Sequence, residues 1–99
     1  MSIEEIKNAF IERNFRYTKH GAEQRINRDI SSDEIEQAIL AGEIIEDYPF
    51  DKYGPSCLIL GKTERGRTLH IQIALYPIIS IVTVYEPTPE KWIDNIIRR

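Results

Sequence analysis

The stretch that decides the fold lies at residues 68–74 and reads Thr-Leu-His-Ile-Gln-Ile-Ala. Its aliphatic residues occupy every second position, so they fall on one face of an extended chain. His70 and Gln72 fall on the other face. This period of two predicts a β-strand with one face in a hydrophobic core and a second face that carries polar side chains.

The residues on either side of this stretch predict its partner strands. Residues 57–61 form an uninterrupted apolar run, as expected for a buried strand. Residues 63–67 contain Gly66, which can adopt a positive φ, and predict a hairpin loop. Residues 78–85 are rich in β-branched side chains and apolar on both faces, which favours a central strand. Ile44 and Ile45 predict a shorter strand that ends at Pro49.

Helices are expected at both ends of the chain. Ser31 and Glu34 have the spacing of a capping box and begin an apolar stripe, and Gly42 suits the left-handed residue that ends a helix. Similar periodicity predicts helices over about 3–13 and 19–27, and Thr88-Pro89 predicts a last helix carrying Trp92 and Ile96. The fold class is therefore α+β: N-terminal helices packed on an antiparallel sheet of three to four strands, with a short C-terminal helix.

Length and composition indicate one globular domain over residues 1–99. The chain has 99 residues, of which 41% are hydrophobic and 29% charged, and its net charge is -3. These values exclude disordered and collagen-like classes. The single Cys57 excludes an internal disulfide, and no signal peptide or membrane-spanning run is evident. We expect a cytoplasmic protein that has no membrane contact and needs no cofactor or metal.

The charged residues are unevenly distributed. Five cations and one acid lie between Arg13 and Arg28, whereas the segment from Asp29 to Asp51 carries eight acids and no Lys or Arg. A second basic cluster comprises Lys62, Arg65 and Arg67. The pattern predicts a polarised surface that is compatible with a phosphate-bearing ligand on one side and a basic partner on another.

The two histidines are the residues best suited to acid–base chemistry. Phosphate-binding glycine loops, nucleophile elbows and zinc-protease motifs are absent from the sequence, and Cys57 fits a buried core position. Across an antiparallel pair, Thr83 and Tyr85 would share a face with His70 if Val82 and Val84 point toward the helices. Alternatively, His20 is a helix-start residue that bonds local carbonyls, His70 is a solvated strand residue, and the other two are packing residues.

These residue types suit metal-free RNA cleavage by the 2′-hydroxyl group. The reaction needs a base, an acid and a cation near the phosphorane. The catalytic candidates are His20, His70 and Tyr85. The candidates for binding the substrate are Arg28, Arg67, Lys62 and Thr83.

Several short motifs together resemble a bacterial family, the domain of unknown function numbered 4258. The similarity covers about residues 15–92. The motifs are Lys19-His20, Arg28-Asp29-Ile30-Ser31, Glu34-Ile35, Gly42-Glu43-Ile44-Ile45, Tyr48-Pro49, Ser56-Cys57-Leu58, Gly66-Arg67-Thr68-Leu69-His70, Ile81-Val82-Thr83-Val84-Tyr85-Glu86-Pro87 and Trp92.

The resemblance implies a RelE/barnase-like fold of the kind found in toxin–antitoxin ribonucleases, and an antitoxin-like partner of the zinc-finger, helix-turn-helix type. The family's polar motif positions correspond to His20, Arg28, His70, Thr83 and Tyr85. The sequence departs from the family at three positions. Gly21 replaces the usual alanine, Gln24 a frequent arginine, and Asp29 a common glycine.

We therefore expect a toxin-like, metal-independent ribonuclease domain. A non-catalytic protein-binding module or degenerate nuclease fold, whose acidic segment from Asp29 to Asp51 faces a basic partner, is the alternative from a different class. A third possibility is a domain whose polar face binds a small anion.

Overall fold

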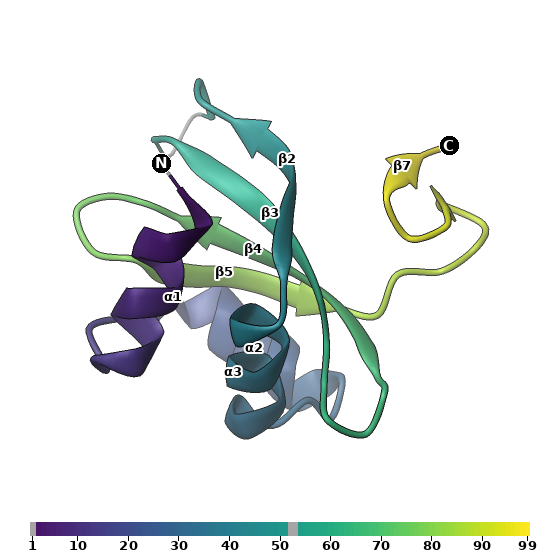
Figure 1. Cartoon of the computed structure of the whole chain (residues 1–99), viewed down its shortest axis with the longest axis horizontal. Coiled ribbons are helices and arrows are strands. Elements are labelled where there is room, and N and C mark those ends of the chain that lie inside the picture. The colour runs from purple at the N-terminus through teal and green to yellow at the C-terminus, as the bar shows by residue number, and fades with distance from the viewer. Residues whose placement is uncertain (1, 52–53) are drawn as a thin grey trace.

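The computed structural model describes residues 2–51 and 54–99, in which helices and a mixed sheet form an α+β fold (Figure 1). The helices are α1 (Ile3–Ile11), α2 (Lys19–Asn27) and α3 (Ser32–Leu40). The strands are β1 (Arg16–Tyr17), β2 (Glu43–Tyr48), β3 (Ser56–Lys62), β4 (Thr68–Ala74), β5 (Ser80–Tyr85), β6 (Trp92–Ile93) and β7 (Ile97–Arg98). No helix among the described residues is both long and apolar enough to cross a membrane.

The main sheet has the strand order β1-β5-β4-β3-β2. Neighbouring strands from β2 to β5 are antiparallel, whereas β1 pairs in parallel with β5. The expected sheet of three to four antiparallel strands therefore gains a fifth, parallel strand. The segment around β1 is fixed by hydrogen bonds from Arg16 N to Ile79 O and from Thr18 N to Ile81 O, both 3.0 Å. These partners lie more than 60 positions away in the sequence, so local periodicity carries no sign of them.

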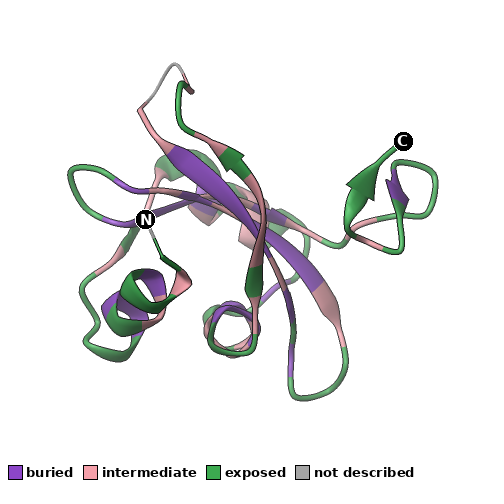
Figure 2. Ribbon diagram, turned by 45° about the horizontal axis from the view of Figure 1, so that its top comes forward, coloured by how far each residue is buried: buried purple, intermediate pink, exposed green. Residues whose placement is uncertain are grey.

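One face of the sheet and the helices enclose the core. Figure 2 shows buried residues running along the centre of the sheet and on the inner side of the helices. The fully buried aliphatic residues include Ile6 of α1, Ile35 of α3 and Ile71 of β4. The face of β4 that was expected to be apolar is therefore the face that packs under the helices.

Two glycines permit helices to lie unusually close to strands. A Cβ atom at Gly21 would be 2.1 Å from the carbonyl oxygen of Ile81, and one at Gly61 would be 1.8 Å from that of Ala38. No side chain fits at such distances, so these glycines allow α2 to approach β5 and α3 to approach β3.

The capping box of α3 is confirmed. Ser31 Oγ accepts from the backbone N–H of Glu34 at 3.1 Å, and Glu34 Oε1 accepts from the backbone N–H of Ser31 at 3.0 Å. The expectation for Gly42 is wrong, since only Gly54 and Gly66 have positive φ among the glycines. Gly42 instead packs closely, because a Cβ there would be 2.7 Å from Ala38 O.

The expected C-terminal helix is wrong. After one turn at Thr88, the chain forms a hairpin of β6 and β7. Asp94 and Asn95 have φ values of 51° and 64°, and these residue types tolerate left-handed turns. Trp92 is 3% exposed and packs on His70 of the sheet.

Candidate functional site

The face of the sheet opposite the helices carries a cluster of polar side chains. The register pairs His70 with Tyr85 and Gln72 with Thr83, which puts all four on this face. A register shift between Gln72 and Ile73 leaves Val82 without a partner on β4. Val84 is buried under the helices as expected, but Val82 borders the open face. The bulge at Val82 therefore extends the open face along β5.

Two adjoining hollows occupy this face, with volumes of about 730 and 720 Å³. Gln72 lines both of them. The first hollow, here the tyrosine hollow, also contains Arg28, Thr83 and Tyr85. The second, here the histidine hollow, contains His20. Both volumes fall within the range of about 300–1,000 Å³ that is typical of small-ligand sites.

His70 lies beneath the tyrosine hollow and is fully buried. Its Nε2 is 2.6 Å from the carbonyl oxygen of Asn95, and its Nδ1 is 3.2 Å from the hydroxyl of Tyr85. A carbonyl oxygen can only accept, so Nε2 carries the proton and donates it. In the neutral ring Nδ1 then accepts the hydrogen bond from Tyr85. The phenol hydroxyl is thus oriented by a buried imidazole, and the oxygen of Tyr85 retains acceptor capacity.

Burial changes the acidity of both groups. The pKa of His70 is lowered, chiefly by burial, although the Asn95 carbonyl acts in the opposite direction. The pKa of Tyr85 is raised, again chiefly by burial. At neutral pH the pair therefore consists of a neutral imidazole and a protonated phenol.

The C-terminal hairpin covers His70. The ring of Trp92 meets that of His70 edge-on with centroids 4.3 Å apart, and the guanidinium of Arg98 lies 4.6 Å from the Trp92 ring centroid. Arg98 also forms an ion pair with Glu46 at 3.0 Å. The hairpin therefore both excludes water from His70 and adds a cation to the rim of the tyrosine hollow.

Arg28 and His20 approach the open face from the two ends of α2. Arg28 Nη1 donates to Val84 O at 2.9 Å, and the exposed side chain lines the tyrosine hollow. His20 is exposed and borders the neighbouring histidine hollow with Arg16 and Thr18. The four residues His20, Arg28, His70 and Tyr85 thus lie on one side of the sheet, but in two adjoining hollows.

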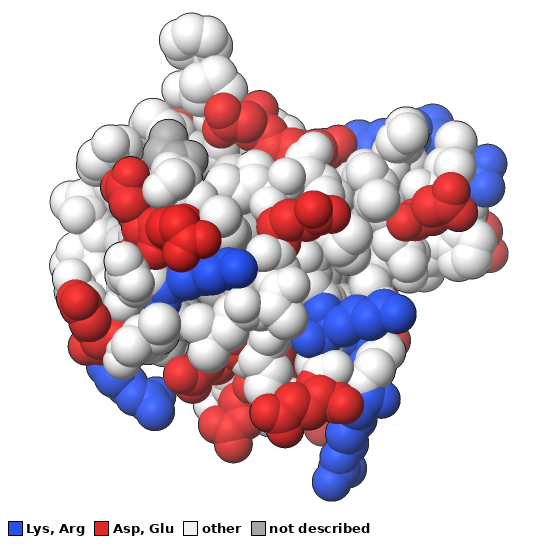
Figure 3. All heavy atoms as spheres, in the orientation of Figure 1, with Lys and Arg blue, Asp and Glu red and all other residues white. Residues whose placement is uncertain are grey.

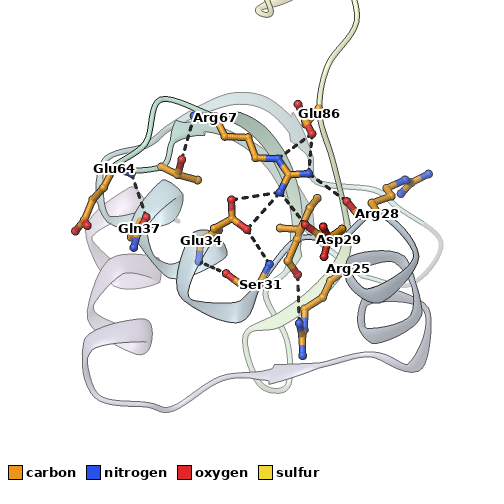
Figure 4. A network of polar contacts seen from close by, with 11 residues as sticks. Arg25, Arg28, Asp29, Ser31, Glu34, Gln37, Glu64, Arg67 and Glu86 are labelled. Atoms are coloured by element: carbon orange, nitrogen blue, oxygen red, sulfur yellow. Dashed lines mark hydrogen bonds and ion pairs between the residues drawn. The ribbon is translucent and has the colours of Figure 1, made fainter.

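Arg67 is fully engaged in contacts within the protein (Figure 4). Its guanidinium pairs with Glu86 at 2.7 Å and with Glu34 at 3.2 Å. It also donates to the carbonyl oxygens of Arg28 at 3.1 Å and Asp29 at 2.8 Å. Arg67 thereby joins the β3–β4 loop to the α2–α3 connection and the end of β5. It lies outside both hollows, so its expected phosphate contact has no support in this geometry.

Lys62 also lies away from the open face, beside the acids of α3. In the orientation of Figure 3, acidic side chains spread over the side formed by α1, α3 and β2 with cations among them, and further cations lie toward the β3–β4 loop and the C-terminal hairpin. The acidic segment seen in the sequence thus largely follows α3 and β2 in space.

The lining of the two hollows has an excess of basic residues although the chain is acidic, and one of these residues, Arg98, is paired with Glu46. The tyrosine and histidine hollows contain more basic than acidic residues, against a net charge of -3 for the chain. Their Lys and Arg residues are Arg16, Arg28, Lys91 and Arg98, and their acids are Asp51 and Glu86. The sequence did not indicate Arg16, Lys91 and Arg98 as site residues. Arg16 borders the site through the long-range pairing of β1, and the other two through the hairpin that replaces the expected helix.

Within residues 2–51 and 54–99, no group of three or more His, Cys, Asp or Glu side chains could hold a metal ion. Cys57 is buried, and burial raises the pKa of its thiol to about 11, with a smaller contribution from Asp47. The thiol is therefore protonated at neutral pH and belongs to the core. The reactive groups of the open face are imidazole, phenol, guanidinium and ammonium.

The protonation state of the His70 ring nitrogens tests the assignment of their hydrogen bonds. We expect ¹⁵N NMR at pH 7 to show a neutral ring protonated at Nε2, and a titration in which the pKa of His70 lies below the ordinary histidine value of 6.5. Because the folded pKa lies below the unfolded one, folding stability should fall as the pH drops below 6.5. The signal that disappears in the His70→Gln variant is that of His70. A ring protonated at Nδ1 at pH 7 would contradict the assignment.

The Arg67 contacts predict a pH-dependent loss of stability. Replacing Arg67 with Ala should lower the free energy of unfolding by about 1–3 kcal/mol at pH 7, because two carboxylates and two carbonyls lose a donor. The pKa of Glu34 is lowered by its hydrogen bond with Ser31 and, secondarily, by Arg67. Its contribution is therefore present above the ordinary pKa of 4.5 and is lost as the pH falls through the folded pKa.

Urea unfolding at pH 7 and pH 3 measures this effect, with Arg65→Ala in the same loop as the control. The difference between wild type and Arg67→Ala should narrow at pH 3. Equal stability of the two proteins at pH 7 would show that the contacts contribute nothing.

The comparisons with known proteins identify the family. A family model described as a domain of unknown function (DUF4258) matches residues 17–86, which include α2, α3 and strands β2 to β5. No curated protein and no solved structure gives a significant match. The matched region contains every sequence-predicted site residue, whereas the C-terminal hairpin lies outside it. Because the match covers well over half of the chain, the chain belongs to the DUF4258 family.

Proposed function

We propose that this chain is a toxin-like, metal-independent endoribonuclease with a RelE/barnase-like fold. The observation that carries the proposal is the Tyr85 hydroxyl, oriented by buried His70 on a face lined by more basic than acidic residues in an otherwise acidic protein. A polyanionic substrate is attracted to such a face. The hydroxyl and imidazole groups there suit acid–base work without a metal.

Tyr85 and His70 form a pair between which a proton can move, and the Asn95 carbonyl holds the imidazole ring in place. The Tyr85 oxygen would accept the proton of the 2′-hydroxyl while the phenol proton passes to Nδ1 of His70. The imidazolium formed would be stabilised by the Asn95 carbonyl at 2.6 Å from Nε2. This carbonyl orients the ring as a carboxylate does in hydrolase triads.

The remaining roles fall to Arg28 and His20. Attack forms a bond from the 2′-oxygen to phosphorus and breaks the bond to the 5′-oxygen. His20, from the adjoining hollow, would donate a proton to that leaving oxygen. Arg28, with Thr83 beside it, would bind the phosphate oxygens. The products are a 2′,3′-cyclic phosphate and a free 5′-hydroxyl.

Cleavage of RNA in EDTA tests the proposal. The wild type should cleave an unpaired RNA and leave a 2′,3′-cyclic phosphate end. Replacing Tyr85 with Phe or His20 with Ala should reduce the rate by about 10²–10⁴-fold, the usual effect of losing acid–base help. Lys62→Ala, a cation away from the open face, is the matched control and should cleave at the wild-type rate.

Two results would overturn the proposal. The first is the absence of cleavage across several RNAs together with no growth arrest on expression. The second is cleavage that Tyr85→Phe and His20→Ala leave unchanged. Circular dichroism of each variant separates lost chemistry from lost folding.

The acidic side of the molecule supports a second candidate, a protein-binding module. Asp33 and Glu36 of α3 border a shallow hollow that shares no lining residue with the tyrosine hollow, whereas Glu46 of β2 pairs with Arg98 at the rim of the tyrosine hollow. A basic protein, such as an antitoxin-like partner, would fit this charge. Salt-dependent association with such a protein and no affinity for RNA would favour this candidate over the nuclease.

A further inference from the structure

Two aromatic side chains project into solvent at one end of the sheet. Phe50, in the β2–β3 loop, is 96% exposed, and Tyr76, in the β4–β5 loop, is 63% exposed. Figure 3 shows uncharged side chains standing out from the β2–β3 loop at the top of the view. Neither ring is buried in the fold, so both are accessible to a ligand.

The two loops lie together and border the proposed nuclease face. Ser56 pairs with Ala74, and Leu75 N donates to Pro55 O at 3.0 Å, so the two loops leave the sheet at the same end. Phe50 borders a third hollow that shares Asp51 and Gln72 with the histidine hollow.

The cations of the face lie next to these rings. Tyr76 itself lines the histidine hollow with Arg16 and His20. Arg98 lines the hollow of Phe50 and also the tyrosine hollow. The two exposed rings therefore lie at the loop end of the open face, with guanidinium groups beside them and Arg28 farther along the face.

This combination of exposed rings and neighbouring cations suits single-stranded nucleic acid. Unpaired bases stack on aromatic side chains, and cations beside them contact the phosphates. In a duplex the bases are already stacked on one another, so exposed rings add nothing to binding. A basic protein segment would lack the regular alternation of flat apolar groups and negative charges.

We propose that the substrate is unpaired RNA, whose bases stack on Phe50 and Tyr76 while its phosphates contact Arg16, Arg98 and Arg28. This inference rests on the proposed nuclease function, since it assigns the substrate class of the same face. It adds two residues from loops that carry none of the acid–base groups.

Binding of an RNA that cannot be cleaved tests the substrate class. A fluorescent 12-mer with 2′-O-methyl groups removes the attacking hydroxyl, so anisotropy reports affinity alone. Phe50→Ala and Tyr76→Ala should each weaken binding by about 5- to 150-fold, as expected for the loss of one stacked base. Phe50→Trp and Tyr76→Phe keep a ring and should bind within about threefold of the wild type.

Two controls sharpen the result. Ile78→Ala removes another exposed apolar side chain from the β4–β5 loop and should leave affinity unchanged. The same 12-mer in a duplex should bind more weakly than the unpaired strand. Its affinity for the wild type and for both alanine variants should be equal. Wild-type affinity of Phe50→Ala and Tyr76→Ala for the unpaired strand, or preference for the duplex, would overturn the inference.

The outcomes of the two proposals are separable. Ring-dependent binding of the unpaired strand without cleavage of any ordinary RNA would support unpaired RNA as the ligand of the face and contradict the nuclease proposal. Cleavage that depends on Tyr85 with ring-independent binding would uphold the nuclease and overturn the substrate class.

Discussion

The antiparallel register of β4 and β5 determines what the open face of the sheet presents. Pairing His70 with Tyr85 and Gln72 with Thr83 sends these side chains away from the helices, because Ile71 and Val84 must enter the core. A slip by one residue would exchange the two sets and bury four polar groups under α2 and α3. The stability of the core and the composition of the candidate site therefore depend on one alignment of two strands.

The C-terminal hairpin changes the character of that face. Without the hairpin, His70 would be a solvated strand residue, as the apolar–polar alternation of residues 68–74 suggests. Trp92 and the Asn95 carbonyl instead enclose the imidazole, lower its pKa through burial and select its tautomer. A surface histidine thereby becomes a buried group that orients the hydroxyl of Tyr85. The hairpin lies outside the residues matched by the family model.

Local patterns predict much of the fold. The alternation of residues 68–74, the capping box at Ser31 and the turn at Gly66 each depend on neighbours in sequence, and all three are confirmed. Strand β1 and the C-terminal hairpin depend on distant partners, Ile79 to Ile81 for the first and His70 for the second. Gly42 is misassigned for the same reason, because packing against Ala38 and Ile59 determines its role.

The candidate site likewise divides into features that local patterns predict and features that depend on distant partners. Placing His70, Gln72, Thr83 and Tyr85 on one face needs only the strand period and an antiparallel partner, and the structure has this arrangement. The engagement of Arg67 by Glu34 and Glu86 depends on three segments meeting in space, so its charge alone suggests a phosphate contact that the geometry does not support. The cations that border the hollows, Arg16 and Arg98, come from elements that local patterns miss.

Although the net charge is -3, basic residues outnumber acidic ones in the lining of the open sheet face, and we propose that this face binds the ligand. Chemical-shift mapping of ¹⁵N-labelled protein with an uncleavable, 2′-O-methylated RNA strand tests whether it does. We expect the largest shifts on β4, β5 and the C-terminal hairpin, including the side-chain amide of Gln72. Shifts centred on α1 and α3, or no shifts at all, would contradict it.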